Sequence, residues 1–143
     1  MAGKEELIEK RLKEGWIKTR MMIEVLAVSE DAAKSSLEKH VEKMEKEKKV
    51  VISAKDFHKI EKVENPLPNL PVGYSNIVSL EVLTENFETL INLIMNYAPS
   101  SAEILTPQNI KIDMGEAQGI LNSLSGLLHK FAAHGLGGVL IGS

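Results

Sequence analysis

The spacing of apolar residues changes twice along the chain, and each change marks a strand that leads into a helix. Between Val78 and Val82 every second residue is apolar, and the apolar positions from Phe87 to Ala98 then recur at helical spacing. A looser copy of this arrangement covers Met21 to Ala27 and Ala33 to Met44. The pattern therefore predicts two strand–helix units in one chain.

A further strand is expected after each of these helices. Val50–Ala54 with Phe57–Val63 is interpreted as one bent strand, and Glu103–Leu105 with Asn109–Ile112 as a last strand interrupted by a proline. Between the two units, Glu64–Gly73 contains three prolines, which remove backbone donors and restrict the residues before them. We expect this segment to be a stiff connection, neither strand nor helix.

A helix is expected at each end of the chain. Lys4 to Glu14 predicts a short amphipathic helix, which must dock because it is marginal in isolation. Asp113 and Glu116 form a capping-box pattern that opens a longer helix, ending after His134. Its apolar stripe must be covered, because only burial offsets the entropy lost in ordering the helix. The stripe consists of Ala117, Ile120, Leu121, Leu124, Leu127, Leu128 and Phe131.

The order of the elements predicts an α+β fold. Between the end helices the order is the βαββαβ pattern of the ferredoxin-like superfold, with an antiparallel sheet and both crossover helices on one face. We expect a single domain: an N-terminal helix (1–15), the βαββαβ core (16–112), a long C-terminal helix (113–134) and a glycine-rich tail (135–143). The C-terminal helix is expected on the second crossover helix, whose apolar arc is wider than the sheet alone can cover. The open sheet face and a second subunit are the alternatives.

Composition excludes several classes of function. The chain has no cysteine, so it has no disulfide, thiolate metal site, iron–sulfur cluster or catalytic thiol. Its net charge is −3 and its lysines are interleaved with glutamates, so nucleic-acid binding is not expected. The charged start lacks the apolar region of a signal peptide, and no apolar run reaches the roughly 20 residues of a membrane span. By elimination, we expect a cytoplasmic protein without a membrane partner.

Arg20, Glu24 and Glu81 are the candidates for a polar binding site. In the superfold the first and third strands are adjacent, so both carboxylates are expected on the open face, where they could bind a metal or share a proton. Lys18 and Arg20 lie on the same face, and salt bridges are the interpretation that we favour. For His40, at the edge of an apolar helical stripe, we expect a packed and hydrogen-bonded side chain.

The motifs of common hydrolases are absent from the chain. It contains neither HExxH nor GxSxG, and His129 and His134 have the wrong spacing to ligate one metal from one helix. The glycines after His134 follow a helix C-terminus, whereas phosphate-binding loops precede a helix N-terminus. We therefore expect no catalytic residue, no metal and no cofactor.

Gly115, Gly119, Ser123 and Gly126 share the side of the C-terminal helix that lies away from its leucines. An interior glycine costs up to about 1 kcal/mol relative to alanine. Several small residues on one side indicate either a second packing surface, which a subunit could occupy, or chance and local flexibility.

The residues do not support membership of the chain in the characterised families that have this layout. RNA-recognition motifs need aromatics on the third strand, and Ile77–Leu83 has none; acylphosphatases need a glycine-rich loop after the first strand, and Ala27–Asp31 has no glycine. Heavy-metal-binding domains need paired cysteines, and regulatory domains of the ACT type usually carry glycine where this chain has an acidic turn. In organisation and composition, the chain resembles conserved prokaryotic, including archaeal, proteins that have no assigned activity.

Two functions are consistent with this sequence. The first is a non-enzymatic interaction or regulatory module that self-associates through the sheet or the last helix. The second is a small-molecule or metal-binding protein, or an enzyme, with a polar site around Arg20, Glu24 and Glu81.

Overall fold

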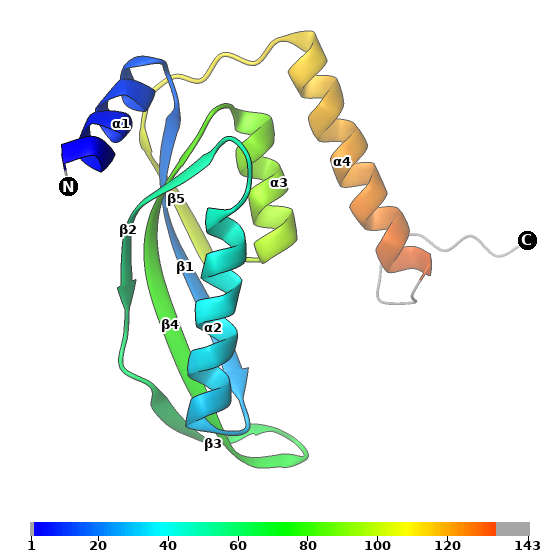
Figure 1. The fold of residues 1–143 in the computed structure, drawn as a ribbon. Helices are drawn as coiled ribbons and strands as arrows, with labels where there is room; N and C mark the ends of the chain where they lie inside the picture. Colours follow the sequence, from blue (N-terminus) through cyan, green and yellow to red (C-terminus); the bar gives the residue numbers. More distant parts are fainter. Residues whose placement is uncertain (1, 134–143) are drawn as a thin grey trace, which may run out of the picture.

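A computed structural model describes residues 2–133 of the chain (Figure 1). Two strand–helix units occur where the apolar spacing predicts them, and each end of this range is a helix. In chain order the elements are α1 (Ala2–Lys13), β1 (Ile17–Ala27), α2 (Glu30–Glu45), β2 (Val50–Phe57), β3 (Glu61–Leu67), β4 (Leu70–Thr84), α3 (Phe87–Tyr97), β5 (Ser101–Thr106) and α4 (Met114–Ala133).

The strands form one antiparallel sheet, with β4 and β1 at its centre. Its order is β2-β4-β1-β5, and β3 pairs with β4 outside this path. The two longest strands pair along the whole of β1, from Ile17 opposite Thr84 to Ala27 opposite Tyr74. The coarse prediction of an α+β fold with an antiparallel sheet is therefore confirmed.

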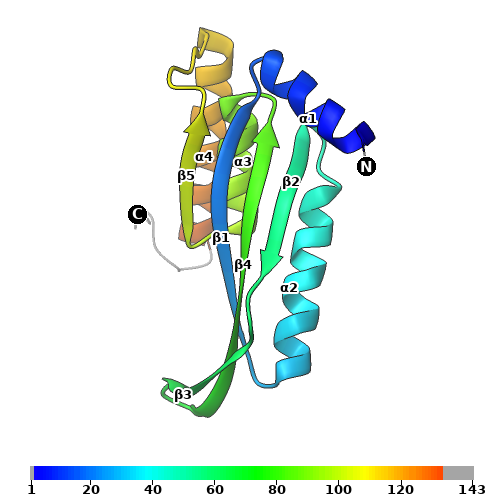
Figure 2. The same ribbon diagram turned by 90° about the vertical axis from the view of Figure 1, so that its left-hand side faces the viewer.

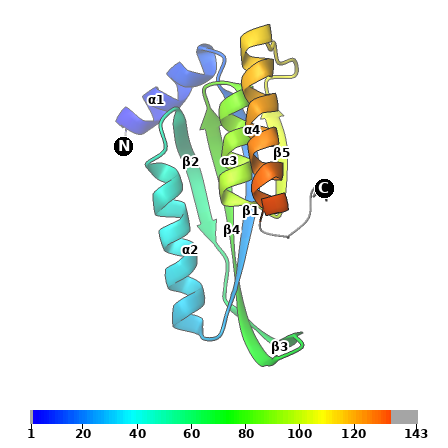
Figure 3. The ribbon, with the colours of Figure 1, turned by 90° about the vertical axis from the view of Figure 1, so that its right-hand side faces the viewer.

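Helices α2 and α3 lie on the same face of the sheet, with α4 beside α3 (Figure 3). Figure 2 shows the opposite face, which no helix crosses except near the end where α1 lies. At that end α1 contacts β4, and Leu83, which points to this side of β4, is fully buried. The predicted N-terminal helix therefore docks, as its short length requires.

The hydrophobic core fills the space between the sheet and helices α2 and α3. Met21 and Leu80, from the two central strands, meet Leu37 of α2 and Leu90 of α3, and all four are at most 2% exposed. Each fully buried side chain of this size contributes roughly 1.5–3 kcal/mol. The alternating residues of the strands and the helically spaced residues of α2 and α3 thus form the two sides of one hydrophobic core.

The helix boundaries follow from capping side chains. Ser29 accepts a hydrogen bond from the Ala32 amide (3.1 Å) at the start of α2, and Asn86 accepts one from the Thr89 amide (2.8 Å) at the start of α3. Helix α3 ends at Ala98, whose φ of 45° is left-handed. The changes from strand to helix occur where the apolar spacing predicts them, and α2 ends at Glu45.

The prediction for Glu64–Gly73 is wrong, because this segment lies within a β-hairpin formed by β3 and β4. Its prolines are tolerated since Pro66 and Pro71 both fall where the strand register shifts, between the pairs Glu64–Val72 and Leu67–Leu70. Within the described range, strand β3 pairs only with β4, so a missing donor on its other side breaks no ladder there. The hairpin extends the sheet beyond the end of α2 (Figure 1).

The last strand is also shorter than predicted. Strand β5 ends at Thr106, and Asn109–Ile112 is a connection to α4, because the chain does not resume its pairing with β1 after Pro107. The predicted tail, 135–143, and the last predicted residue of the C-terminal helix lie outside the described residues. Among residues 2–133, no helix is long and apolar enough to cross a membrane.

Candidate functional site

The open face of the sheet carries paired charges at its centre. Lys18 contacts Glu81 across β1 and β4, with 3.0 Å between Nζ and Oε1. Arg20 contacts Glu103 of β5 instead, at 3.3 Å. The register places Arg20 opposite Glu81, so these two candidate site residues are neighbours in space, yet each forms its ion pair with another residue. Both contacts are partly exposed and therefore contribute little to stability.

Glu24 lies on the same face but apart from this cluster. Its carboxylate accepts a hydrogen bond of 2.6 Å from the Ser75 hydroxyl. In the register Glu24 is opposite Ile77, four residues from Glu81 along β4, a separation of roughly 13 Å at the rise of a strand. Glu24 and Glu81 therefore cannot share a metal or a proton. No group of three potential metal-ligating side chains occurs among residues 2–133.

A hollow of about 250 Å³ lies between β1, β2 and β4. Arg20 and Lys55 supply its positive charge, but Lys55 Nζ is 3.0 Å from the Glu45 carboxylate and Arg20 contacts Glu103. A ligand would have to compete with carboxylates of the chain itself. The lining residues are Arg20, Ala54, Lys55, Asp56, Ser79, Leu80 and Glu81.

His40 is packed and hydrogen-bonded, as predicted. Its Nε2 lies 2.9 Å from the backbone oxygen of Tyr97, at the end of α3, and its ring meets the Tyr97 ring edge-on. The Tyr97 hydroxyl donates a hydrogen bond of 2.8 Å to Glu47. Burial, together with the nearby Glu47 carboxylate, raises the pKa of Tyr97 to about 12. This group joins α2 to α3 and has a structural role.

At the other end of α3, the capping box predicted for α4 forms only in part. The Asp113 carboxylate accepts a hydrogen bond of 2.8 Å from the Glu116 amide, which caps α4. The Glu116 carboxylate does not close the box. It accepts a hydrogen bond of 3.0 Å from the Glu88 amide in the first turn of α3. Glu116 therefore connects α4 to the positive end of the neighbouring helix dipole.

Small residues of α4 lie on the side that packs against α3. Gly119 and Ser123 are half-buried there, together with Ile120 and Leu127. A Cβ atom on Gly119 would overlap the Glu88 carboxylate. The second packing surface inferred from the small residues is therefore partly used within the chain. A Cβ atom on Gly126 would meet no other described residue within 4 Å.

The opposite side of α4 is apolar and is exposed in the part of the chain that the structure describes. We define the α4 seam as Met114, Ala117, Leu121, Leu124, Leu128 and Phe131, all of which are exposed. The leucine stripe that had to be buried is thus split: Ile120 and Leu127 face α3, whereas most of its residues lie in the seam. Met114 was missed by the sequence analysis. Met114 lies three residues before Ala117, and this step continues the three- and four-residue spacing of the stripe, which is the signal that would have found it.

An α+β protein whose helix α4 packs on α3 and exposes an apolar side is the class that this fold and this surface define. The chain belongs to the MJ0538 family, whose model matches residues 18–140. No curated protein and no solved structure matches the chain. These comparisons agree with the resemblance drawn from the sequence, which was to conserved proteins without an assigned activity.

Proposed function

We propose that the protein is a non-enzymatic interaction module that self-associates through the α4 seam. The observation that carries this proposal is the exposure of five large apolar side chains in a single stripe: Met114, Leu121, Leu124, Leu128 and Phe131. Burying each of them in an interface would contribute up to roughly 1.5–3 kcal/mol. Contiguous apolar patches of this kind mark interaction sites more often than they mark idle surface.

The polar groups of the sheet face support a module over an enzyme. A catalytic acid or base usually has a strongly shifted pKa and lies in a cleft. The pKa of Tyr97 is raised in this way, but Tyr97 is buried between helices and does not lie on the sheet face. The charges of Lys18, Arg20 and Glu81 are compensated by their neighbours.

We also propose the ferredoxin-like superfold as the finer description of the core. If β2 and β3 are counted as one broken strand, the sheet order β2-β4-β1-β5 corresponds to that of the βαββαβ pattern. The separate pairing of β3 with β4 is then an extension of the central hairpin.

Sedimentation velocity over a dilution series would test self-association, with Leu121→Glu as the disrupting variant. Leu121 is 58% exposed, so a carboxylate there is tolerated in the monomer. In the interface it would be buried without a partner, and we expect dimer affinity to fall by at least ~100-fold.

Val28→Glu is the matched control, because Val28 is 70% exposed but lies before α2, away from the seam. It should sediment like the natural chain. A natural chain that stays monomeric up to high micromolar concentration would refute the proposal, and equal affinities for all three proteins would move the interface away from α4.

The second candidate function is binding of a small anion in the hollow beside Arg20 and Lys55. The hollow itself, of about 250 Å³, is the observation in its favour. Thermal shift with small carboxylates and phosphate, and with Ca²⁺ or Mg²⁺ for the metal alternative, would test it. Stabilisation by the anions that disappears in Arg20→Ala would support this function, and no shift at millimolar concentration would exclude it.

A further inference from the structure

We infer that two copies of this chain pair through their α4 seams in antiparallel orientation. The two-fold axis would pass between Leu121 and Leu124 of each copy. This inference rests on the proposed self-association and adds to it the partner surface and its direction.

The spacing of the seam is that of a helix-to-helix contact. From Met114 to Phe131 its residues follow steps of three, four, three, four and three, without a break. Such a strict repeat places the side chains along a narrow stripe that fits the seam of a second helix. A helix that covers a sheet or a globular surface usually has a wider apolar stripe, so the seam favours a helix as its partner.

The residues that flank the seam favour a second copy over a charged partner. On one flank lie Gln118, Ser125 and Ala132, and on the other lie Ile120 and Leu127. None of them is charged, so a second identical seam brings no like charges together. A partner with charged flanks would find no complementary charge here, whereas the short side chains of Ser125 and Ala132 allow another helix to approach closely.

The sizes of the seam residues favour the antiparallel direction. With the axis between Leu121 and Leu124, these two residues face each other, Ala117 faces Leu128, and Met114 faces Phe131. The layer volumes then differ less than in a parallel pair, which favours close packing along the whole seam. In a parallel pair each residue would meet its own copy, which leaves a gap at Ala117 and crowds two rings at Phe131. Antiparallel helices also bring opposite dipole ends together.

The available area suits a reversible dimer. Exposure of the five large seam residues ranges from 39% for Leu124 to 86% for Met114, which at roughly 200 Å² per fully exposed side chain is roughly 500 Å² per copy. Two copies would bury about 1,000 Å², which is near the lower limit for a specific interface. We therefore expect a dimer that dissociates on dilution.

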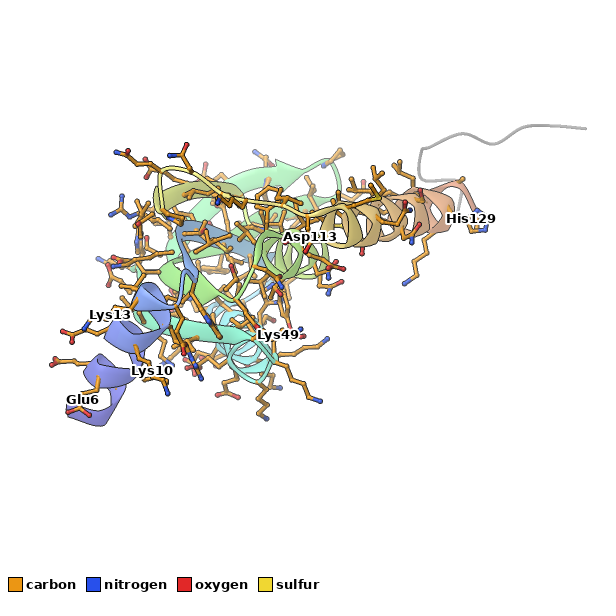
Figure 4. The ribbon with its side chains drawn as sticks, turned by 90° about the horizontal axis from the view of Figure 1, so that it is seen from above. Glu6, Lys10, Lys13, Lys49, Asp113 and His129 are labelled. Carbon is orange, nitrogen blue, oxygen red and sulfur yellow. The ribbon has the colours of Figure 1, made fainter. Side chains whose placement is uncertain are left out.

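Among residues 2–133, no element covers this side of α4. Contact with α3 is made by the other side of the helix, through Gly119, Ile120 and Ser123. Figure 4 shows that α4 runs outward from Asp113, beside the body, to His129 at its far end. A second copy can reach the seam without displacing α3.

Single cysteines can test this geometry, because the natural chain contains none. The experiment mixes tagged Gln118→Cys with untagged Ser125→Cys and adds a short thiol-specific crosslinker. Both positions are exposed and flank the seam. In the antiparallel pair, position 118 of one copy lies next to position 125 of the other, so the tagged and untagged chains should crosslink. Adding Leu128→Glu to both chains should abolish the product.

A chain with the single substitution Ala117→Cys tests for the parallel orientation. In a parallel pair the two introduced thiols would face each other and oxidise to a disulfide, whereas in the antiparallel pair they are about 11 residues apart along the axis and roughly 16 Å from each other. A disulfide-linked Ala117→Cys dimer would overturn the inference.

Two further outcomes separate this inference from the proposed function. A natural chain that sediments as a dimer, while neither cysteine experiment gives a product, would retain self-association but refute the seam pairing. A natural chain that is monomeric would refute both self-association and the seam pairing. The occupant of the seam would then be a different protein.

Discussion

Replacement of Glu116 by alanine should loosen the attachment of α4 to the rest of the fold. The Glu116 carboxylate accepts a 3.0 Å hydrogen bond from the Glu88 amide, which otherwise has no acceptor within its own helix. Loss of a capping side chain costs about 0.5–2 kcal/mol, and loss of a negative charge at this end of α3 costs about 0.3–1 kcal/mol. Since Glu116 is half-exposed, we expect a total near 1 kcal/mol.

Amide hydrogen exchange would locate the effect, and denaturant unfolding would measure its size. In Glu116→Ala the Glu88 amide should exchange much faster. The Thr89 amide, which is bonded to Asn86 at 2.8 Å, is the internal reference and should change little. Glu116→Gln keeps an acceptor oxygen but removes the charge, so it should fall between the natural chain and the alanine variant.

The reasoning would be refuted by an unchanged exchange rate at Glu88 in Glu116→Ala. Asp113→Ala is the matched control, because Asp113 caps only α4, through the Glu116 amide at 2.8 Å. It should destabilise the start of α4 without exposing the amide of α3.

Two further predictions concern α3 and α4. Folded Tyr97 keeps its proton to about pH 12, whereas an unfolded tyrosine loses its proton near pH 10. The folded state therefore binds more protons between these values, and the free energy of unfolding should fall by up to about 3 kcal/mol as pH rises through them. Tyr97→Phe should remove this part of the decline when denaturant unfolding is compared between pH 9 and 12, and equal declines in the two proteins would contradict the prediction. Gly126→Ala should raise the free energy of unfolding by about 0.5–1 kcal/mol, since the new Cβ would meet no other described residue. Gly119→Ala should gain less, because its new Cβ must displace the Glu88 carboxylate. Neither glycine lies in the α4 seam, so association measured by sedimentation should be unchanged in both variants, and weaker association would place a subunit contact on the glycine side.

Local patterns were enough to predict most of the fold. The switch from two-residue to helical spacing located β1, α2, β4 and α3, and the structure adds that Ser29 and Asn86 cap the two helices. The β3–β4 hairpin was missed because prolines normally interrupt strands. Their tolerance here depends on a register shift at the sheet edge, which is a property of the pairing and not of the local sequence.

The candidate sites were only partly predictable, for a similar reason. Adjacency of Arg20 and Glu81 followed from the expected neighbours in the sheet, but the separation of Glu24 from Glu81 depends on the register between β1 and β4. On α4 the apolar stripe was evident from spacing. The spacing did not predict which part of the stripe faces α3, because that depends on the close approach at Gly119 and on the hydrogen bond from the Glu88 amide to the Glu116 carboxylate.

Native mass spectrometry of the untagged natural chain, over a range of concentrations, tests the central claim most directly. Our account predicts a dimer at twice the bare chain mass that dissociates on dilution, with no retained ligand. A monomer at every concentration would contradict it. Extra mass that disappears on denaturation would instead direct attention to the sheet face and to a bound small molecule.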